Sequence, residues 1–173
     1  RKVYIIAEAG VNHNGSLKRA KDLINIAKNA GADCIKFQAF DSSKLSTKKN
    51  KLAPYQKKKT KFKNQIEMLN QYQLTNLQFF KLLKYAKIKK IDFLCSPFDL
   101  ASIDLLSSLN IKTFKIPSGE ITNYPYLRYL GKKNKMIILS TGMSNITEIK
   151  QALTLLTKSG TSKKNITLLH CTS

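Results

Sequence analysis

The stretch IDFLCSPFDLASIDLLSSLNIKTFKIPSGE, residues 91–120, contains the pattern that decides the fold. Its apolar runs 91–96 and 111–116 predict two strands, and the segment between them, 99–110, predicts a helix. Two strands joined through a helix form a βαβ unit, in which the strands are parallel. The stretch therefore predicts an α/β fold with a parallel sheet.

Similar units follow one another along the rest of the chain. Further strands are predicted at 3–7, 33–39, 135–139 and 165–170, and further helices at 17–30, 74–89, 126–132 and 145–159. Such repetition is typical of the (β/α)8 TIM barrel, which has about 250 residues when complete. The 173 residues are therefore expected to form one incomplete barrel domain, 1–173, truncated to about six strands and five helices, with the missing strands beyond residue 173.

Polar residues that could take part in chemistry stand near the end of each predicted strand. In a TIM barrel the active site lies at the carboxyl ends of the strands, so we expect these residues on one face. The pattern predicts an enzyme. In chain order the candidates are Glu8, Asn12, Lys36, Gln38, Ser96, Lys115, Ser118, Glu120, Ser140, Thr141, His170 and Thr172.

Lys36 and Lys115 each interrupt an apolar predicted strand. A buried ammonium is costly, so each lysine needs an anionic partner. That partner is either a structural carboxylate, such as Glu8 or Glu120, or a phosphate or carboxylate of a substrate. The serines at neighbouring strand ends favour a substrate, because hydroxyls suit phosphate oxygens. A strand lysine also fits a Schiff-base aldolase, which is the rival enzyme class.

Glu8 and Glu120 end the first and fourth predicted strands. Across the mouth of a closed barrel, two carboxylates can hold sugar hydroxyls and manage protons on opposite sides of a reacting centre. The alternative is that each only neutralises a lysine. The turn Asn12–Gly15, NHNG, is either an anion-binding helix N-terminus or a plain turn. His13 within it is either a metal ligand or acid, or simply a loop histidine.

The formal charge of +21 suggests a nucleic-acid-binding fragment as a rival class. Only Arg1, Arg19 and Arg128 are arginines, however, and lysine is spread over helix faces and loops, including a predicted irregular stretch at 41–64 that is either a solvated excursion or a lid. Recognition of bases and phosphates favours arginine. We therefore expect no nucleic-acid partner, and an anionic small substrate instead.

The three cysteines, Cys34, Cys95 and Cys171, have no metal-binding spacing, and each lies at or in an apolar strand. They are expected to be buried, reduced thiols, which fits a cytoplasmic protein. The sequence contains no apolar run of about 18 residues. It therefore predicts no membrane partner.

The strand ends carry six motifs in a fixed order. They are IIAEAGVNHNG at 5–15, GADCIKFQAF at 31–40, FLCSPFD at 93–99, FKIPSGEITNYP at 114–125, ILSTGMSN at 138–145 and LLHCTS at 168–173. Together they resemble the sialic acid synthase family over nearly the whole chain. Within it, the segments APYQ at 53–56 and SPFDLASIDLL at 96–106 look more like the bacterial legionaminic acid synthase branch than the N-acetylneuraminate synthase branch.

The resemblance implies a transferase of carbohydrate biosynthesis that joins phosphoenolpyruvate to an N-acylated mannosamine-type sugar. The products are a nine-carbon sialic acid, N-acetylneuraminate or N,N'-diacetyllegionaminate, and phosphate. C3 of phosphoenolpyruvate attacks the open-chain aldehyde, which a divalent metal (Mn or Mg) polarises. Water then adds at C2, and phosphate leaves with C–O cleavage.

The resemblance also assigns roles to residues. Glu8 and Glu120 match catalytic carboxylates: Glu8 holds the hydroxyls of the acceptor sugar, with Asn12 beside it, and Glu120 lies near C2. Ser173 stands where many members have an asparagine in the phosphate site. The phosphoenolpyruvate-binding positions are Lys36, Ser96, Lys115, Ser118, Ser140 and Ser173.

Other parts of the family's site are expected beyond residue 173. They are two strands that carry histidine ligands of the metal, and a C-terminal antifreeze-like domain that reaches into the partner subunit of a homodimer. This chain is therefore expected to hold no metal ligand and to be inactive alone.

Overall fold

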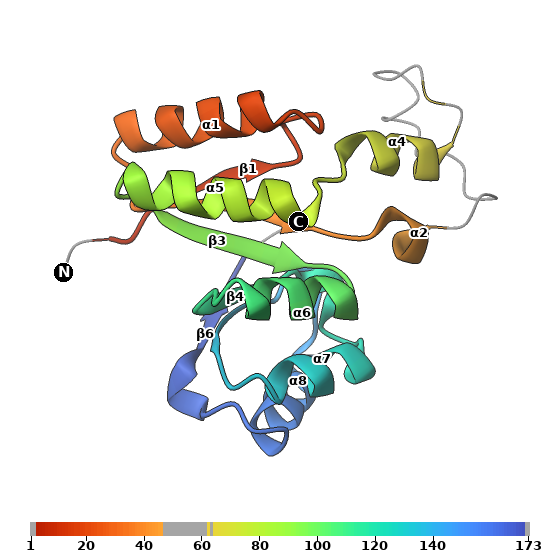
Figure 1. Ribbon diagram of the computed structural model, residues 1–173. Coiled ribbons are helices and arrows are strands. Elements are labelled where there is room, and N and C mark those ends of the chain that lie inside the picture. The colour runs from red at the N-terminus through yellow and green to blue at the C-terminus, as the bar shows by residue number, and fades with distance from the viewer. Residues whose placement is uncertain (1–2, 47–61, 63, 172–173) are drawn as a thin grey trace. The chain divides into compact units, whose positions relative to one another are not determined.

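The computed structural model describes residues 3–46, 62 and 64–171. By their internal contacts, the residues fall into two compact units, Arg1–Phe93 and Leu94–Ser173. The described strands form a parallel sheet in chain order, labelled in Figure 1. They are β1 (Ile6–Gly10), β2 (Cys34–Ala39), β3 (Asp92–Pro97), β4 (Thr113–Ile116), β5 (Met136–Ser140) and β6 (Ile166–Leu169). The predicted α/β fold with about six strands is confirmed.

In the first unit, helices α1 (Leu17–Asn29) and α5 (Asn76–Ile88) lie side by side (Figure 1). Ser16 caps α1 by accepting a hydrogen bond from the backbone N–H of Arg19. The buried positions recur every three or four residues, which gives each helix one apolar face for the core. They are Ala20, Ile24 and Ala27 in α1, and Phe79, Leu82 and Ala86 in α5.

In the second unit, strands β4, β5 and β6 are accompanied by helices α6 (Leu100–Ser108), α7 (Tyr124–Gly131) and α8 (Ile146–Lys158). Single 3₁₀ turns, η1 (Ser118–Glu120) and η2 (Lys163–Asn165), follow β4 and precede β6. The residues that these helices bury completely include Ile103, Leu106, Leu127, Leu130, Ala152 and Leu156. All five predicted helices are present, although α7 begins two residues before the predicted start at 126.

The first strand differs from its prediction. It was predicted at 3–7 but runs from Ile6 to Gly10, so Glu8 lies inside the strand and not at its end. Pairing with β2 continues through a register shift between Glu8 and Gly10. The small residues Ala9 and Gly10 carry no bulky apolar signal, yet both are buried. The strand thus continues past the irregularity through residues that give no hydrophobic pattern to detect.

The stretch 41–64, predicted to be irregular, contains a short helix, α2 (Ser42–Leu45), and residues 47–61 and 63 lie outside the described part. A further helix that was not predicted, α4 (Gln65–Tyr72), follows it. Its N-cap, Asn64, accepts a hydrogen bond from the backbone N–H of Glu67. Asn followed three residues later by Glu is a helix-start signal that the hydrophobic period of so short a segment concealed.

No helix within the described ranges is both long and apolar enough to cross a membrane.

Candidate functional site

Strands β1 and β2 place an acid and a base side by side in the first unit. Their parallel register pairs Glu8 with Lys36, and the Glu8 carboxylate forms an ion pair with the Lys36 ammonium. Gly10 makes room for this carboxylate. Its φ is +51°, and a Cβ built there would lie 3.1 Å from Glu8 Oε1. Any larger residue would be strained by the backbone conformation and would crowd the pair.

In this structure, the anion that neutralises Lys36 is the structural carboxylate of Glu8. The Lys36 side chain is 14% exposed, whereas that of Glu8 is 51% exposed. Glu8 is thus accessible to an approaching group, whereas the mostly buried Lys36 needs another anion in place of Glu8 if that carboxylate turns away.

The NHNG turn after β1 contains an exposed residue, Asn12, and a buried one, His13. Asn12 is exposed, and its backbone N–H donates to the Ala9 carbonyl oxygen at 3.0 Å. His13 is buried, and its Nδ1 accepts a hydrogen bond from the Gly15 N–H at 3.0 Å. Burial lowers the pKa of His13, although the nearby Gly10 carbonyl opposes the change, so the ring is neutral at pH 7. The turn holds His13 as a buried loop histidine.

No group of three or more histidine, cysteine, aspartate or glutamate side chains could hold a metal ion in the part of the chain that the structure describes.

Strands β4 and β5 bring Lys115 and Ser140 together in the second unit. The Lys115 side chain is buried, and its ammonium donates to Ser140 Oγ at 2.6 Å and to the Ile116 carbonyl oxygen at 3.0 Å. Because Ser140 accepts this bond, its own hydroxyl hydrogen can be donated to a third group. The arrangement is suited to an anion that binds the ammonium and the hydroxyl together.

Cys171, after β6, lies next to the same donors. It was predicted to be buried but is partly exposed, whereas Cys34 and Cys95 are buried as predicted. The hydrogen bond with Ser140 lowers the pKa of the Cys171 thiol, with smaller contributions from the backbone N–H groups of Thr141 and Gly142 and from the Lys115 charge. A depressed thiol pKa reports surroundings that favour negative charge. The sequence alone did not predict these surroundings of Cys171.

Of the other predicted residues of this unit that the structure describes, Thr141 and His170 directly follow β5 and β6, and the rest lie at or after the carboxyl ends of β3 and β4. Ser96 is buried within β3. Ser118 and Glu120 are half-buried on η1, and Glu120 Oε2 accepts a hydrogen bond from Asn123 Nδ2 at 2.7 Å. Thr172 and Ser173 lie outside the described residues, as does the segment APYQ at 53–56.

Tyr126 is a supporting residue that the sequence did not single out. Its buried hydroxyl donates to the Pro97 carbonyl oxygen at 2.8 Å, and so ties α7 to the end of β3. Burial, together with the negative charge of Glu120, raises the pKa of Tyr126, so the phenol stays protonated as a donor. An aromatic residue with a polar tip inside the predicted helix 126–132 was the only signal.

The predicted residues thus form two observed groupings. Glu8 contacts Lys36 in the first unit, and Lys115 contacts Ser140, with Cys171 beside it, in the second. The chemical roles given to these residues stay predictions.

Comparison with known proteins gives the family. Residues 23–173 match the model of the NeuB family. The chain is 53% identical over its full length to an N,N'-diacetyllegionaminic acid synthase of Campylobacter jejuni and covers 52% of that protein. It is 36% identical to the human N-acetylneuraminate-9-phosphate synthase over 98% of the chain and 46% of that enzyme.

A solved structure agrees in fold. The crystal structure of a sialic acid synthetase from Leptospira borgpetersenii superposes with a TM-score of 0.85 at 29% identity, over 100% of this chain and 55% of the other. The chain thus spans about half the length of the relatives that it matches. The six motifs predicted a member of the sialic acid synthase family, and the chain belongs to the NeuB family.

Proposed function

We propose that the protein carrying this chain condenses phosphoenolpyruvate with an N-acylated mannosamine-type sugar to give a nine-carbon sialic acid and phosphate. The observation that carries the proposal is the buried Lys115 ammonium bonded to Ser140 at the strand ends of a NeuB-family chain. The names of the relatives, which are synthases of legionaminic, neuraminic and pseudaminic acids, support a product of this class.

In this proposal, Lys115 and Ser140 bind one charged end of phosphoenolpyruvate. The ammonium supplies charge in a site of low exposure, and the Ser140 hydroxyl supplies a donor. The depressed pKa of Cys171 supports this, because its causes are donors that would serve an anion equally well. Ser96, Ser118 and Ser173 would add hydroxyls to the same substrate.

Lys36 and Glu8 would act together on the strands of the first unit. Lys36 would bind phosphoenolpyruvate, while Glu8 turns to the hydroxyls of the acceptor sugar, which a carboxylate accepts strongly. The ion pair holds the two side chains next to each other on β1 and β2. Asn12, exposed beside them, would add an amide contact to the sugar.

The proposed condensation proceeds in three steps. The C3 carbon of phosphoenolpyruvate forms a bond to the aldehyde carbon, whose oxygen becomes a hydroxyl by taking a proton. Water adds to the cationic C2, and Glu120 accepts the proton that the water loses. The C2–O bond to the phosphate then breaks with its electron pair leaving on the phosphate, and the new C2 hydroxyl gives its proton to the departing phosphate as the 2-keto group forms.

Several further features belong to the same proposal. A divalent ion, Mn or Mg, would polarise the aldehyde. The described residues offer no ligand set for it, so its ligands are expected elsewhere in the protein. We also propose a 2,4-diacetamido-trideoxy acceptor, as in the legionaminic branch, a homodimeric assembly and a cytoplasmic location. The 53% identity to a legionaminic acid synthase supports the choice of acceptor.

Neutralising either lysine should weaken binding of phosphoenolpyruvate. Lys115→Ala and Lys36→Ala each remove a charge-assisted contact worth roughly 1.5 to 3 kcal/mol, so KM for phosphoenolpyruvate should rise about ten- to a hundredfold. Steady-state kinetics of the full protein measure this. Lys112→Ala, which removes an exposed charge next to β4, is the matched control and should change little. Equal effects in all three variants would refute the anion-binding role.

Glu8→Gln should chiefly impair use of the acceptor sugar. The substitution keeps the side-chain shape but replaces charge-assisted hydrogen bonds with neutral ones, so KM for the acceptor should rise about tenfold. Asp22→Asn, on the exposed side of α1, removes the same charge and serves as the control. If instead KM rose for phosphoenolpyruvate alone, Glu8 would act only by holding Lys36.

Cys171 should report occupancy of the phosphoenolpyruvate site. Its lowered pKa gives more thiolate at pH 7, so iodoacetamide should label it before Cys34, whose pKa burial raises to about 11. Phosphoenolpyruvate should slow the labelling, and Lys115→Ala should slow it in the free protein by raising the thiol pKa. Peptide mass spectrometry measures both rates. Labelling that is indifferent to phosphoenolpyruvate would place the substrate elsewhere.

A further inference from the structure

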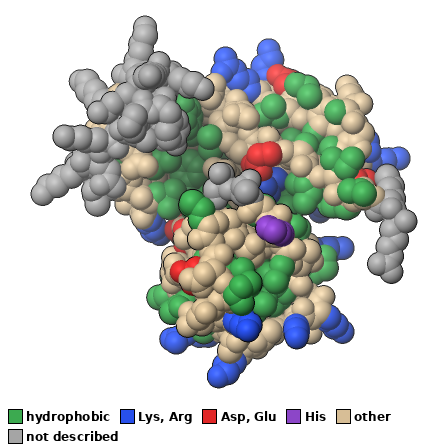
Figure 2. Space-filling view, turned by 180° about the vertical axis from the view of Figure 1, so that it is seen from behind, with side chains coloured by type: hydrophobic (Ala, Val, Ile, Leu, Met, Phe, Trp, Pro, Cys, Tyr) green, Lys and Arg blue, Asp and Glu red, His purple; other side chains and the backbone are tan. Residues whose placement is uncertain are grey.

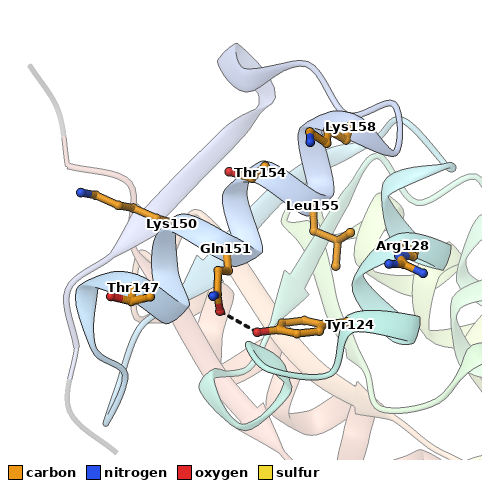
Figure 3. A pocket seen from close by; sticks show the side chains of 8 residues that line it. All are labelled: Tyr124, Arg128, Thr147, Lys150, Gln151, Thr154, Leu155 and Lys158. Carbon is orange, nitrogen blue, oxygen red and sulfur yellow. Dashed lines mark hydrogen bonds between the residues drawn. The ribbon is translucent and has the colours of Figure 1, made fainter.

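A groove on the outer helices of the second unit is not used by the proposed chemistry. It lies between α7 and α8 and has a volume of about 520 Å³ (Figure 3). That volume is within the range of small-molecule sites. Its lining residues come from helices and not from strand ends; they are Tyr124, Arg128, Thr147, Lys150, Gln151, Thr154, Leu155 and Lys158.

The helical repeat explains why these residues line one groove. The six that come from α8 recur at spacings of three or four residues between 147 and 158, so they form one stripe along that helix. The two from α7, Tyr124 and Arg128, are four apart and share a face. The opposite face of α8 carries the buried residues Ala152 and Leu156. The groove is therefore held by two helices that are anchored in the core.

Contacts between the helices fix the groove near each end. Near the start of α7, the Tyr124 hydroxyl donates to Gln151 Oε1 at 2.6 Å, which leaves the amide nitrogen of Gln151 as a donor (Figure 3). At the end of α7, Gly131 packs directly on α8, where an added Cβ would lie 2.7 Å from Ser159 Cβ and 3.1 Å from the Leu156 carbonyl oxygen. The spacing of the helices is thus set by packing.

The charges that line the groove are all of one sign. Arg128, Lys150 and Lys158 line it, and no carboxylate does. The surface cation Lys133, which does not line the groove, differs in having a carboxylate beside it: its ammonium lies 2.7 Å from Asp104 Oδ1. On the face that Figure 2 shows, basic side chains are dispersed among polar and apolar ones. Because three cations line the same groove, its local field is positive.

We propose that this groove binds a small molecule carrying at least two negative charges, as phosphate or carboxylate groups. Arg128, Lys150 and Lys158 would bind the charged groups, with donors from Gln151, Thr147 and Thr154. Leu155 and Tyr124 would contact the uncharged part of the ligand. The inference is independent of the condensation reaction, because no lining residue lies on η1 or on a strand.

Calorimetric titration of the full protein tests the proposal, with pyrophosphate and tricarballylate as probes of the two anion types at about 0.15 M salt, where weak surface binding is screened. The titrations use a Lys115→Ala background to weaken the strand-end site. We expect one saturable site for at least one probe. The double substitution Lys150→Gln and Lys158→Gln should weaken it at least tenfold while leaving condensation by the otherwise native protein unchanged.

The matched control is Lys163→Gln with Lys164→Gln, which removes the same charge from the exposed η2 turn. Binding that survives in this control but not in the groove variant supports the site. Equal loss in both variants would show a general charge effect and overturn the proposal. If neither pyrophosphate nor tricarballylate binds saturably, the proposal is also overturned, whatever the condensation assay gives.

Discussion

The hydrogen bonds of the buried Lys115 ammonium are the interactions on which the proposed anion site depends. A charged lysine inside a parallel sheet is costly unless its donors are satisfied. Here Ser140, from the next strand, and the Ile116 carbonyl accept two of its hydrogen bonds. The register of β4 and β5 makes this possible, because it places Lys115 opposite Ile138, two residues before Ser140. The hydrogen bond with Ser140, with a smaller contribution from the Lys115 charge, lowers the pKa of the Cys171 thiol.

The fold itself was largely predictable. Repeats of apolar runs and amphipathic segments predicted every βα unit, because a helix that covers a sheet must keep one apolar face and a buried strand must be apolar. Helix α8 illustrates this, since its buried Ala152 and Leu156 follow the helical period. Helix α4 was missed because its eight residues bury only Met68, which gives no period to detect.

For the candidate site, the sequence indicated residues but did not decide their contacts. Position at strand ends selected Glu8, Lys36, Lys115 and Ser140, and it left open whether a structural carboxylate such as Glu8 or a substrate anion would neutralise Lys36. The pairing that the structure shows follows from the parallel register of β1 and β2, which places Glu8 opposite Lys36 before the shift at Gly10. The partial exposure of Cys171 likewise depends on where the chain turns after β6. Local sequence does not encode either feature.

The most direct test of the central claim is isotopic. The full protein would be incubated with phosphoenolpyruvate labelled with ¹⁸O at the C2–O–P bridge and with an N-acylated mannosamine-type or 2,4-diacetamido-trideoxy sugar, and both products analysed by mass spectrometry. Because the C–O bond breaks, we expect a nine-carbon 2-keto acid without the label and inorganic phosphate that contains it. Label retained in the keto acid, or no nine-carbon product with either sugar, would contradict the proposed condensation.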